Sequence, residues 1–166
     1  MSTLIFNADE VFEIAKRIER RGVAFYRAAA THMPDEATVQ LMRSLADMEA
    51  QHEATFKQMQ DALSETEKAE ILQDPHGDAF DFLRGMADGY VFDLNEDPIA
   101  FLDGKPSGKS ILNKAIEREA ESVAFYTGIR SMVSVKHGQG RILEIIQQEM
   151  GHIAQLSKEL RKCEEK

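Results

Sequence analysis

Apolar residues recur three and four positions apart along four long segments of the chain, the spacing that places side chains on one face of an α-helix. Prolines and glycines fall mostly outside these segments, which are rich in residues that favour helices, such as alanine, glutamate and leucine. The pattern therefore predicts four long helices: from about Asp9 to His32, from Asp35 to about Leu63, from Ser107 or Ser110 to about Val133, and from just after Gly140 to about Lys162.

The connections between these helices predict how they pair. Short loops join the first helix to the second and the third to the fourth, which indicates two antiparallel hairpins. The hairpins are separated by about 45 residues, from 64 to 109, a crossover too long to lack structure inside a compact domain. We therefore expect a single all-α domain spanning residues 1–166, a four-helix bundle with a long crossover.

The crossover is expected to contain a short extra helix over residues 78–92, lying against the bundle. One stripe of this helix is apolar and consists of Phe80, Leu83, Ala87 and Tyr90. Three further apolar residues fall off the stripe, and we expect them to contact a second subunit in a homodimer: Phe82, Met86 and Phe92.

An internal repeat relates the two hairpins at a distance of one hundred residues. Glu19 and Tyr26 recur as Glu119 and Tyr126, and the string Glu-x-x-His occurs twice, at Glu49 to His52 and at Glu149 to His152. The repeat is retained mainly at glutamate, histidine and tyrosine rather than at aliphatic positions. This indicates that the repeated residues perform one task twice.

Helical spacing places the repeated glutamates in the middle of the apolar stripe of each long helix, and these stripes contain no lysine or arginine. Buried carboxylates must be protonated, paired or bound to cations. Two divalent ions would balance four carboxylates beside neutral histidines, and this set of residue types is the ligand set of di-iron carboxylate bundles. The candidate metal ligands are Glu19, Glu49, His52, Glu119, Glu149 and His152.

The segments around these residues resemble the ferritin-like di-iron proteins, and more closely their rubrerythrin-related branch. The likeness is carried by IERRGVAFY at 18–26, MEAQHE at 48–53, EAESVAFY at 119–126 and QEMGH at 148–152. It implies a ferritin-like four-helix bundle in which Glu49 and Glu149 bridge two irons. Glu19 with His52 would complete one iron site, and Glu119 with His152 the other. Tyr26 and Tyr126 would orient the carboxylates.

The resemblance also implies an activity, reduction of hydrogen peroxide with electrons from a separate donor protein. The chain departs from the rubrerythrin pattern in two ways: it has no rubredoxin domain, and Ile116 stands where that branch has an extra glutamate. Six symmetric ligands are also typical of a ferroxidase, which oxidises Fe(II) with oxygen or peroxide. A non-enzymatic metal-binding or interaction module is a third reading. Manganese or zinc can occupy the same ligands.

Composition excludes several classes of partner and of site. The net charge of −9 argues against nucleic acid or an anionic membrane surface as the main partner. The single cysteine, Cys163, allows neither a disulfide framework nor a metal site with four thiolate ligands within one chain. No segment has the length of a membrane span, and the first residues do not have the pattern of a secretion signal, so we expect a cytoplasmic protein.

Overall fold

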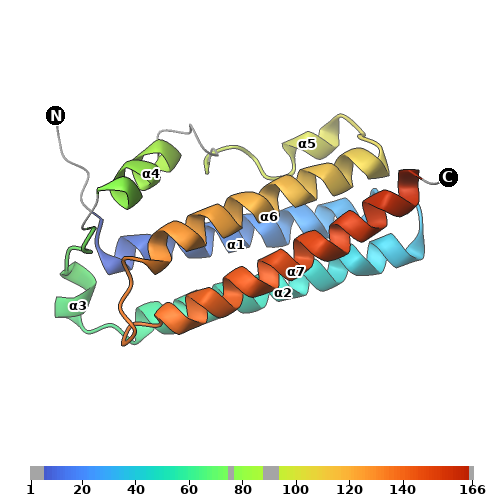
Figure 1. Ribbon diagram of the computed structural model, residues 1–166. Helices are drawn as coiled ribbons and strands as arrows, with labels where there is room; N and C mark the ends of the chain where they lie inside the picture. Colours follow the sequence, from blue (N-terminus) through green and yellow to red (C-terminus); the bar gives the residue numbers. More distant parts are fainter. Residues whose placement is uncertain (1–5, 75–76, 88–93, 165–166) are drawn as a thin grey trace.

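A computed structural model describes residues 6–74, 77–87 and 94–164, and these residues form an all-helical fold (Figure 1). The four long helices of the bundle lie within a few residues of the bounds expected from the sequence. They are α1 (Ala8–Ala30), α2 (Glu36–Asp61), α6 (Gly108–Arg130) and α7 (Gln139–Glu164).

Polar side chains immediately before three of these helices determine where they begin, because they accept hydrogen bonds from backbone amides that have no partner inside the helix. The Asn7 side chain accepts from the amide of Glu10, whose carboxylate accepts from the Asn7 amide in return. Asp35 caps α2, as expected. Of the two serines considered for the third long helix, Ser107 is the cap.

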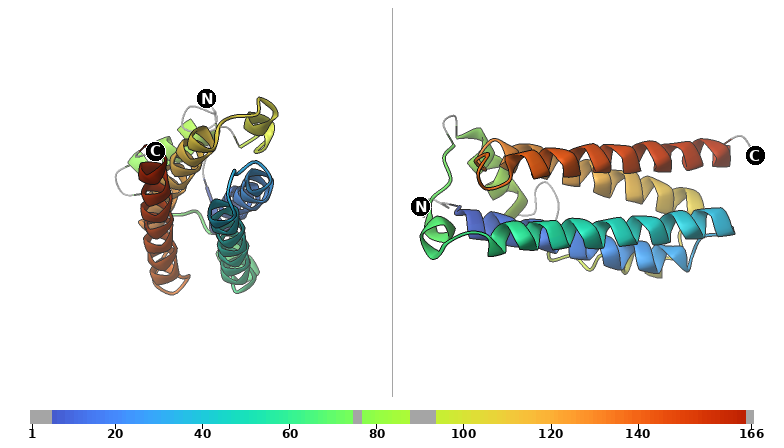
Figure 2. Two further views of the ribbon diagram at one scale, coloured as in Figure 1. Left: turned by 90° about the vertical axis from the view of Figure 1, so that its right-hand side faces the viewer. Right: turned by 90° about the horizontal axis from the view of Figure 1, so that it is seen from below.

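The long helices pair in sequence order, α1 with α2 and α6 with α7, and the two hairpins pack side by side to form the bundle (Figure 2). The crossover runs the length of the bundle between the end of α2 and the start of α6 (Figure 1). As a result α1 and α7 run in the same direction, and so do α2 and α6. The predicted four-helix bundle with a long crossover is confirmed.

The described part of the crossover contains three short helices, α3 (Glu65–Ala69), α4 (Asp78–Ala87) and α5 (Ala100–Asp103). The expected extra helix is α4, which contacts α6. Tyr90 and Phe92 lie outside the described residues. The expected role of Met86 in a subunit contact is wrong, because its side chain is 2% exposed and packs inside the chain. Phe82 is partly buried against the same core.

The apolar core is divided into two clusters with polar residues between them. One cluster contains Phe12, Phe56 and Ile142, and the other contains Met42 and Leu156. Each long helix contributes apolar side chains to its ends and a glutamate to its middle, as the stripes in the sequence indicate. None of the helices that the structure describes is long and apolar enough to cross a membrane.

Candidate metal centre

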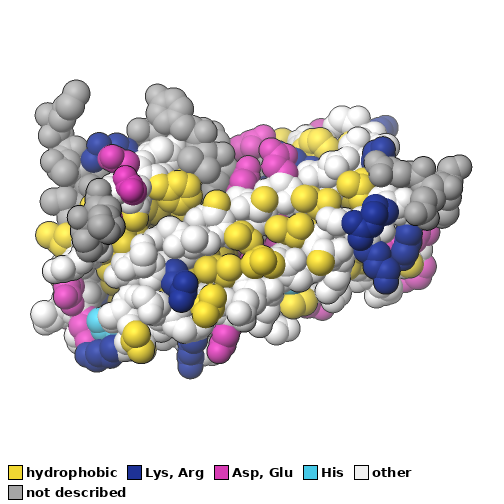
Figure 3. Space-filling model, viewed as in Figure 1, with side chains coloured by type: hydrophobic (Ala, Val, Ile, Leu, Met, Phe, Trp, Pro, Cys, Tyr) yellow, Lys and Arg dark blue, Asp and Glu magenta, His cyan; other side chains and the backbone are white. Residues whose placement is uncertain are grey.

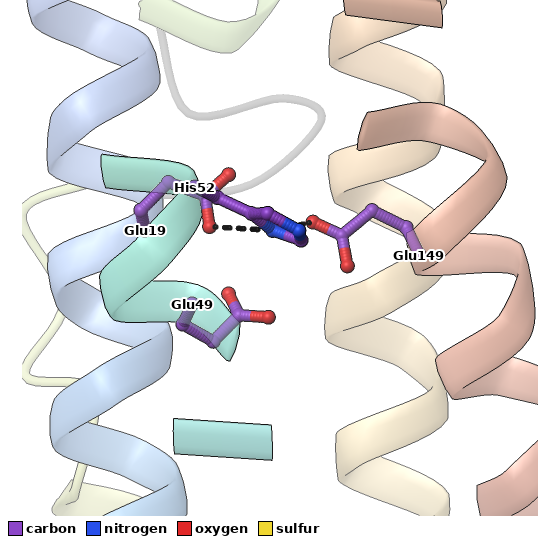
Figure 4. Close-up of side chains that lie close together, drawn as sticks. All are labelled: Glu19, Glu49, His52 and Glu149. Atoms are coloured by element: carbon purple, nitrogen blue, oxygen red, sulfur yellow. Dashed lines mark ion pairs between the residues drawn. The ribbon is translucent and has the colours of Figure 1, made fainter. Parts of the chain in front are cut away.

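Four glutamates and two histidines meet in the middle of the bundle, at most 3% exposed. Each long helix contributes one glutamate, and α2 and α7 also contribute a histidine one turn later. Figure 4 shows the imidazole of His52 lying between the carboxylates of Glu19 and Glu149, with Glu49 beside them. The buried set comprises all six residues expected from the sequence: Glu19, Glu49, His52, Glu119, Glu149 and His152.

These side chains form two overlapping groups, each of which offers four ligand atoms within 4.8 Å of one another. The first group is Glu19, Glu49, His52 and Glu149, and the second is Glu49, Glu119, Glu149 and His152. Glu49 and Glu149 belong to both groups, whereas each of the other four residues belongs to one. The geometry therefore has the pattern of two adjacent sites that share two carboxylates.

Distances within the cluster show that the Nδ1 atom of each imidazole faces the carboxylates. His152 Nδ1 lies 2.7 Å from Glu149 Oε2 and 3.3 Å from Glu119 Oε2. His52 Nδ1 lies 3.1 Å from Glu149 Oε1 and 3.5 Å from Glu19 Oε2. The two rings are stacked, with their centroids 5.8 Å apart. Both histidines thus direct the same ring nitrogen to the centre of the bundle.

Several buried atoms of the cluster have no hydrogen-bond partner, although a buried polar atom without one is costly. They are Glu19 Oε2, Glu49 Oε1, His52 Nδ1 and both carboxylate oxygens of Glu149. All are atoms that the two groups would direct at a cation. Oxygen and imidazole nitrogen are donors that suit iron, manganese and zinc. The residues therefore fit a pair of transition-metal ions.

Ionisation of the cluster is shifted strongly in the absence of metal. Burial raises the pKa of Glu19, Glu49 and Glu119, the last to about 8. Burial acts in the same direction on Glu149, but the imidazoles of His152 and His52 beside it lower its pKa to about 2. Burial acts to lower the imidazole pKa values, but the neighbouring carboxylates outweigh it and raise the pKa of His52 to about 11 and that of His152 to about 9. The metal-free cluster therefore holds protons that a metal must displace.

The two repeated tyrosines reach across the bundle to the opposite hairpin. Tyr26 on α1 donates a hydrogen bond to Glu119 on α6, and Tyr126 on α6 donates one to Glu19 on α1. Burial and the neighbouring carboxylates hold the pKa of both phenols well above the usual value, so both hydroxyls keep the protons they donate. Each tyrosine orients the glutamate that belongs to only one of the two groups.

Two further residues contact the histidines and were not identified from the sequence. Gln148 Oε1 lies 2.7 Å from His52 Nε2, and Met48 Sδ lies 3.3 Å from His152 Nε2. They occupy the same position in the repeat, immediately before each Glu-x-x-His string. The contact to Gln148 fixes the ring orientation of His52, as outer partners do in metal sites. The signal that could have identified them in the sequence is their equivalent position in the repeat.

A cavity of about 200 Å³ opens onto the cluster between α1 and α6. Its lining includes Gly22 and Ser122, the two small residues at equivalent positions of the repeat, together with Tyr26, Glu49 and Glu119. A Cβ atom at Gly22 would collide with the Glu49 carboxylate and lie 3.0 Å from its Cδ. Glycine is thus what allows Glu49 to take its place in both groups.

Ile116, which replaces the extra glutamate of the rubrerythrin pattern, packs beside one of the apolar clusters. Glu117 and Glu121 line the cavity but belong to neither of the two candidate ligand groups. The site is therefore built from six residues in a symmetric arrangement.

No known family model matches the chain, and no curated protein is significantly similar to it in sequence. A crystal structure from Thermotoga maritima, provisionally described as that of a ferritin-like diiron-carboxylate protein, is similar in fold, with a TM-score of 0.75 and 25% sequence identity. The similarity covers 96% of this chain and 97% of that one. The chain therefore has a ferritin-like fold, and its buried cluster of glutamates and histidines resembles the site of a diiron-carboxylate protein.

Proposed function

We propose that the buried cluster binds two iron ions and that the loaded protein reduces hydrogen peroxide with electrons from a separate donor protein. Glu49 and Glu149 would bind both ions, Glu19 and His52 would complete one site, and Glu119 and His152 the other. The single observation that carries the proposal is the overlap of the two buried groups through these shared glutamates.

The reaction requires two electrons and two protons for each peroxide, because cleavage of its O–O bond yields two molecules of water. A bound pair of ferrous ions would supply the two electrons together, and the donor protein would restore them. Tyr26 and Tyr126 hold Glu119 and Glu19 in place through their hydroxyl protons. The cavity beside Gly22 and Ser122 admits a molecule as small as peroxide to the ligands Glu49 and Glu119.

The proposal is tested by loading the protein anaerobically with Fe(II) and mixing it with equimolar peroxide or oxygen in a stopped-flow instrument. We expect peroxide to oxidise the centre faster than oxygen, and a reducing donor to support repeated turnover. Faster oxidation by oxygen would contradict the peroxidase assignment. Glu149→Ala serves as the control, since loss of a shared ligand abolishes both reactions.

A ferroxidase function is the second candidate, with Fe(II) as a substrate that enters through the cavity. The observation that favours it is the lining of the cavity, in which five glutamates, among them Glu96, Glu117 and Glu121, outnumber three basic residues. The two functions differ in what becomes of the iron. A ferroxidase releases Fe(III) and accepts fresh Fe(II) in successive additions, whereas the proposed peroxidase retains two ions per chain through many turnovers.

A further inference from the structure

The two histidines of the cluster meet different atoms on their outer sides, although the repeat makes their positions equivalent. His52 Nε2 lies 2.7 Å from the amide oxygen of Gln148, whereas His152 Nε2 lies 3.3 Å from the sulfur of Met48. Each histidine takes this outer partner from the opposite hairpin, since Gln148 belongs to α7 and Met48 to α2. The two contacts therefore have the same place in the repeat but different chemistry.

This difference affects the N–H group that each imidazole presents when it binds a metal. Nδ1 of both rings faces the carboxylates, so a ring that binds a cation through Nδ1 carries its proton on Nε2. An amide oxygen is a strong acceptor for that proton, and a thioether sulfur is a weak one. The contact at His52 therefore holds the ring and its tautomer for metal binding more firmly than the contact at His152 does.

The tyrosine contacts of the cluster do not carry this difference. Tyr26 donates a hydrogen bond to Glu119, and Tyr126 donates the equivalent bond to Glu19. Each of the two candidate groups thus has one tyrosine bonded to the glutamate that belongs to it alone. Residues 48 and 148 break the symmetry that the tyrosines keep.

The cavity beside the cluster also distinguishes the two groups. Among the carboxylates of the cluster, its described lining includes Glu49 and Glu119, and both belong to the group of His152. The lining is completed by residues of α6 and of the crossover, and Figure 3 shows acidic side chains gathered where the crossover lies along α6. A cation that enters through the cavity therefore reaches the group whose histidine has the weaker outer contact.

We propose that the two sites bind metal unequally: the site of Glu19 and His52 binds its ion more tightly and fills first. Gln148 is a positioning residue for this site, and Met48 is a weaker substitute in the other. The inference rests on the proposed binding of two ions. Loss of an outer partner of a metal-binding histidine weakens metal affinity about 10- to 100-fold, so the two dissociation constants should differ by at least about tenfold.

Anaerobic equilibrium dialysis against Fe(II) tests the inference, first in the wild type and then in variants that keep a single site. The wild type should bind two ions in two steps whose dissociation constants are at least about tenfold apart. Glu119→Gln leaves the site of His52, and Glu19→Gln leaves the site of His152. We expect Fe(II) to bind Glu119→Gln at least about ten times more tightly than Glu19→Gln.

Exchange of the two outer partners provides the sharper test. Met48→Gln, added to Glu19→Gln, should tighten Fe(II) binding about tenfold, a gain that a merely structural role of this position does not predict. Gln148→Met, added to Glu119→Gln, should weaken binding about tenfold. Gln147→Met changes an exposed neighbour in the same helix and should leave the affinity unchanged. Circular dichroism should show wild-type helicity in every variant.

The outcomes separate this inference from the proposed function. Two ions bound to the wild type with equal affinity would overturn the inference and leave the two-ion centre intact. The same conclusion would follow if the single-site affinities did not respond to Met48→Gln and Gln148→Met. A wild type that binds fewer than two ions per chain would overturn the inference together with the proposed function.

Discussion

Replacement of Gly22 by alanine should separate metal binding from folding, because the added methyl group meets only the far end of one side chain. The new Cβ would collide with the carboxylate of Glu49 and lie 3.1 Å from its Cγ. A flexible glutamate can swing its carboxylate aside in the metal-free protein. Alanine also favours the helix over glycine by about 1 kcal/mol. We therefore expect the free energy of unfolding of metal-free Gly22→Ala to stay within about 1 kcal/mol of wild type.

The metal-bound protein should respond much more strongly. Glu49 belongs to both candidate groups, so its displacement removes one ligand from each ion. A hundredfold weaker affinity would remove about 2.7 kcal/mol of the stabilisation that metal provides. For a chain of this size that corresponds to a loss of about 5 to 10 °C from the metal-induced rise in melting temperature.

Differential scanning calorimetry with and without Fe(II) under anaerobic conditions measures both quantities. Two matched controls isolate the collision. Ser122→Ala introduces no new Cβ atom at the equivalent position of the repeat, and Gly151→Ala adds a Cβ in α7 that meets nothing within 4 Å. Both controls should keep the full metal-induced rise. An unchanged rise in Gly22→Ala would refute the idea that Glu49 must occupy its observed place to bind metal.

Three further predictions concern the cluster itself. Tyr26→Phe and Tyr126→Phe remove the hydroxyls bonded to Glu119 and Glu19, and each should weaken Fe(II) binding about 10- to 100-fold in titrations without lowering helicity. Glu19→Gln should retain one ion per chain by elemental analysis, whereas Glu149→Gln should retain none, and equal losses would contradict shared ligation. Finally, the melting temperature of the metal-free protein should fall between pH 6 and pH 9, while the rise caused by metal grows.

The sign of that pH dependence follows from the raised pKa values of the folded state. A carboxyl such as Glu119, with a pKa raised to about 8 by burial, stabilises the fold fully below its unfolded pKa near 4.5, and this contribution disappears as the pH passes 8. The imidazoles of His52 and His152 act in the same direction from pH 6.5 upward. The lowered pKa of Glu149 gives a contribution to stability that is constant above about pH 4.5 and is lost only as the pH falls toward 2. If the melting temperature of the metal-free protein does not change over this pH range, the buried cluster is not protonated as described.

The sequence predicted the long helices and the six clustered residues because both depend on local periodicity. A glutamate inside an apolar stripe must face the core wherever that helix packs, and the repeat at one hundred residues linked the four stripes. Details that depend on packing between hairpins were not predictable in this way. The partner of Tyr26 is Glu119 rather than a residue of its own hairpin, and Gln148 reaches His52 across the bundle.

The crossover also contains features that could not be predicted from local periodicity. Its apolar pattern predicted α4, but the helices α3 and α5 have only five and four residues, too few to establish a periodicity. Met86 was assigned to a subunit contact because it fell off the apolar stripe, yet α4 packs so that Met86 is buried against the core of its own chain. Orientation of a short helix is set by the surface it meets.

The most direct test of the account is a crystal structure of the Fe(II)-loaded protein with data collected at the iron absorption edge. The account predicts two anomalous peaks per chain about 4 Å apart in the middle of the bundle. Glu49 and Glu149 should contact both peaks, and Nδ1 of His52 and of His152 should contact one each. A single peak, or two peaks that share neither glutamate, would contradict it.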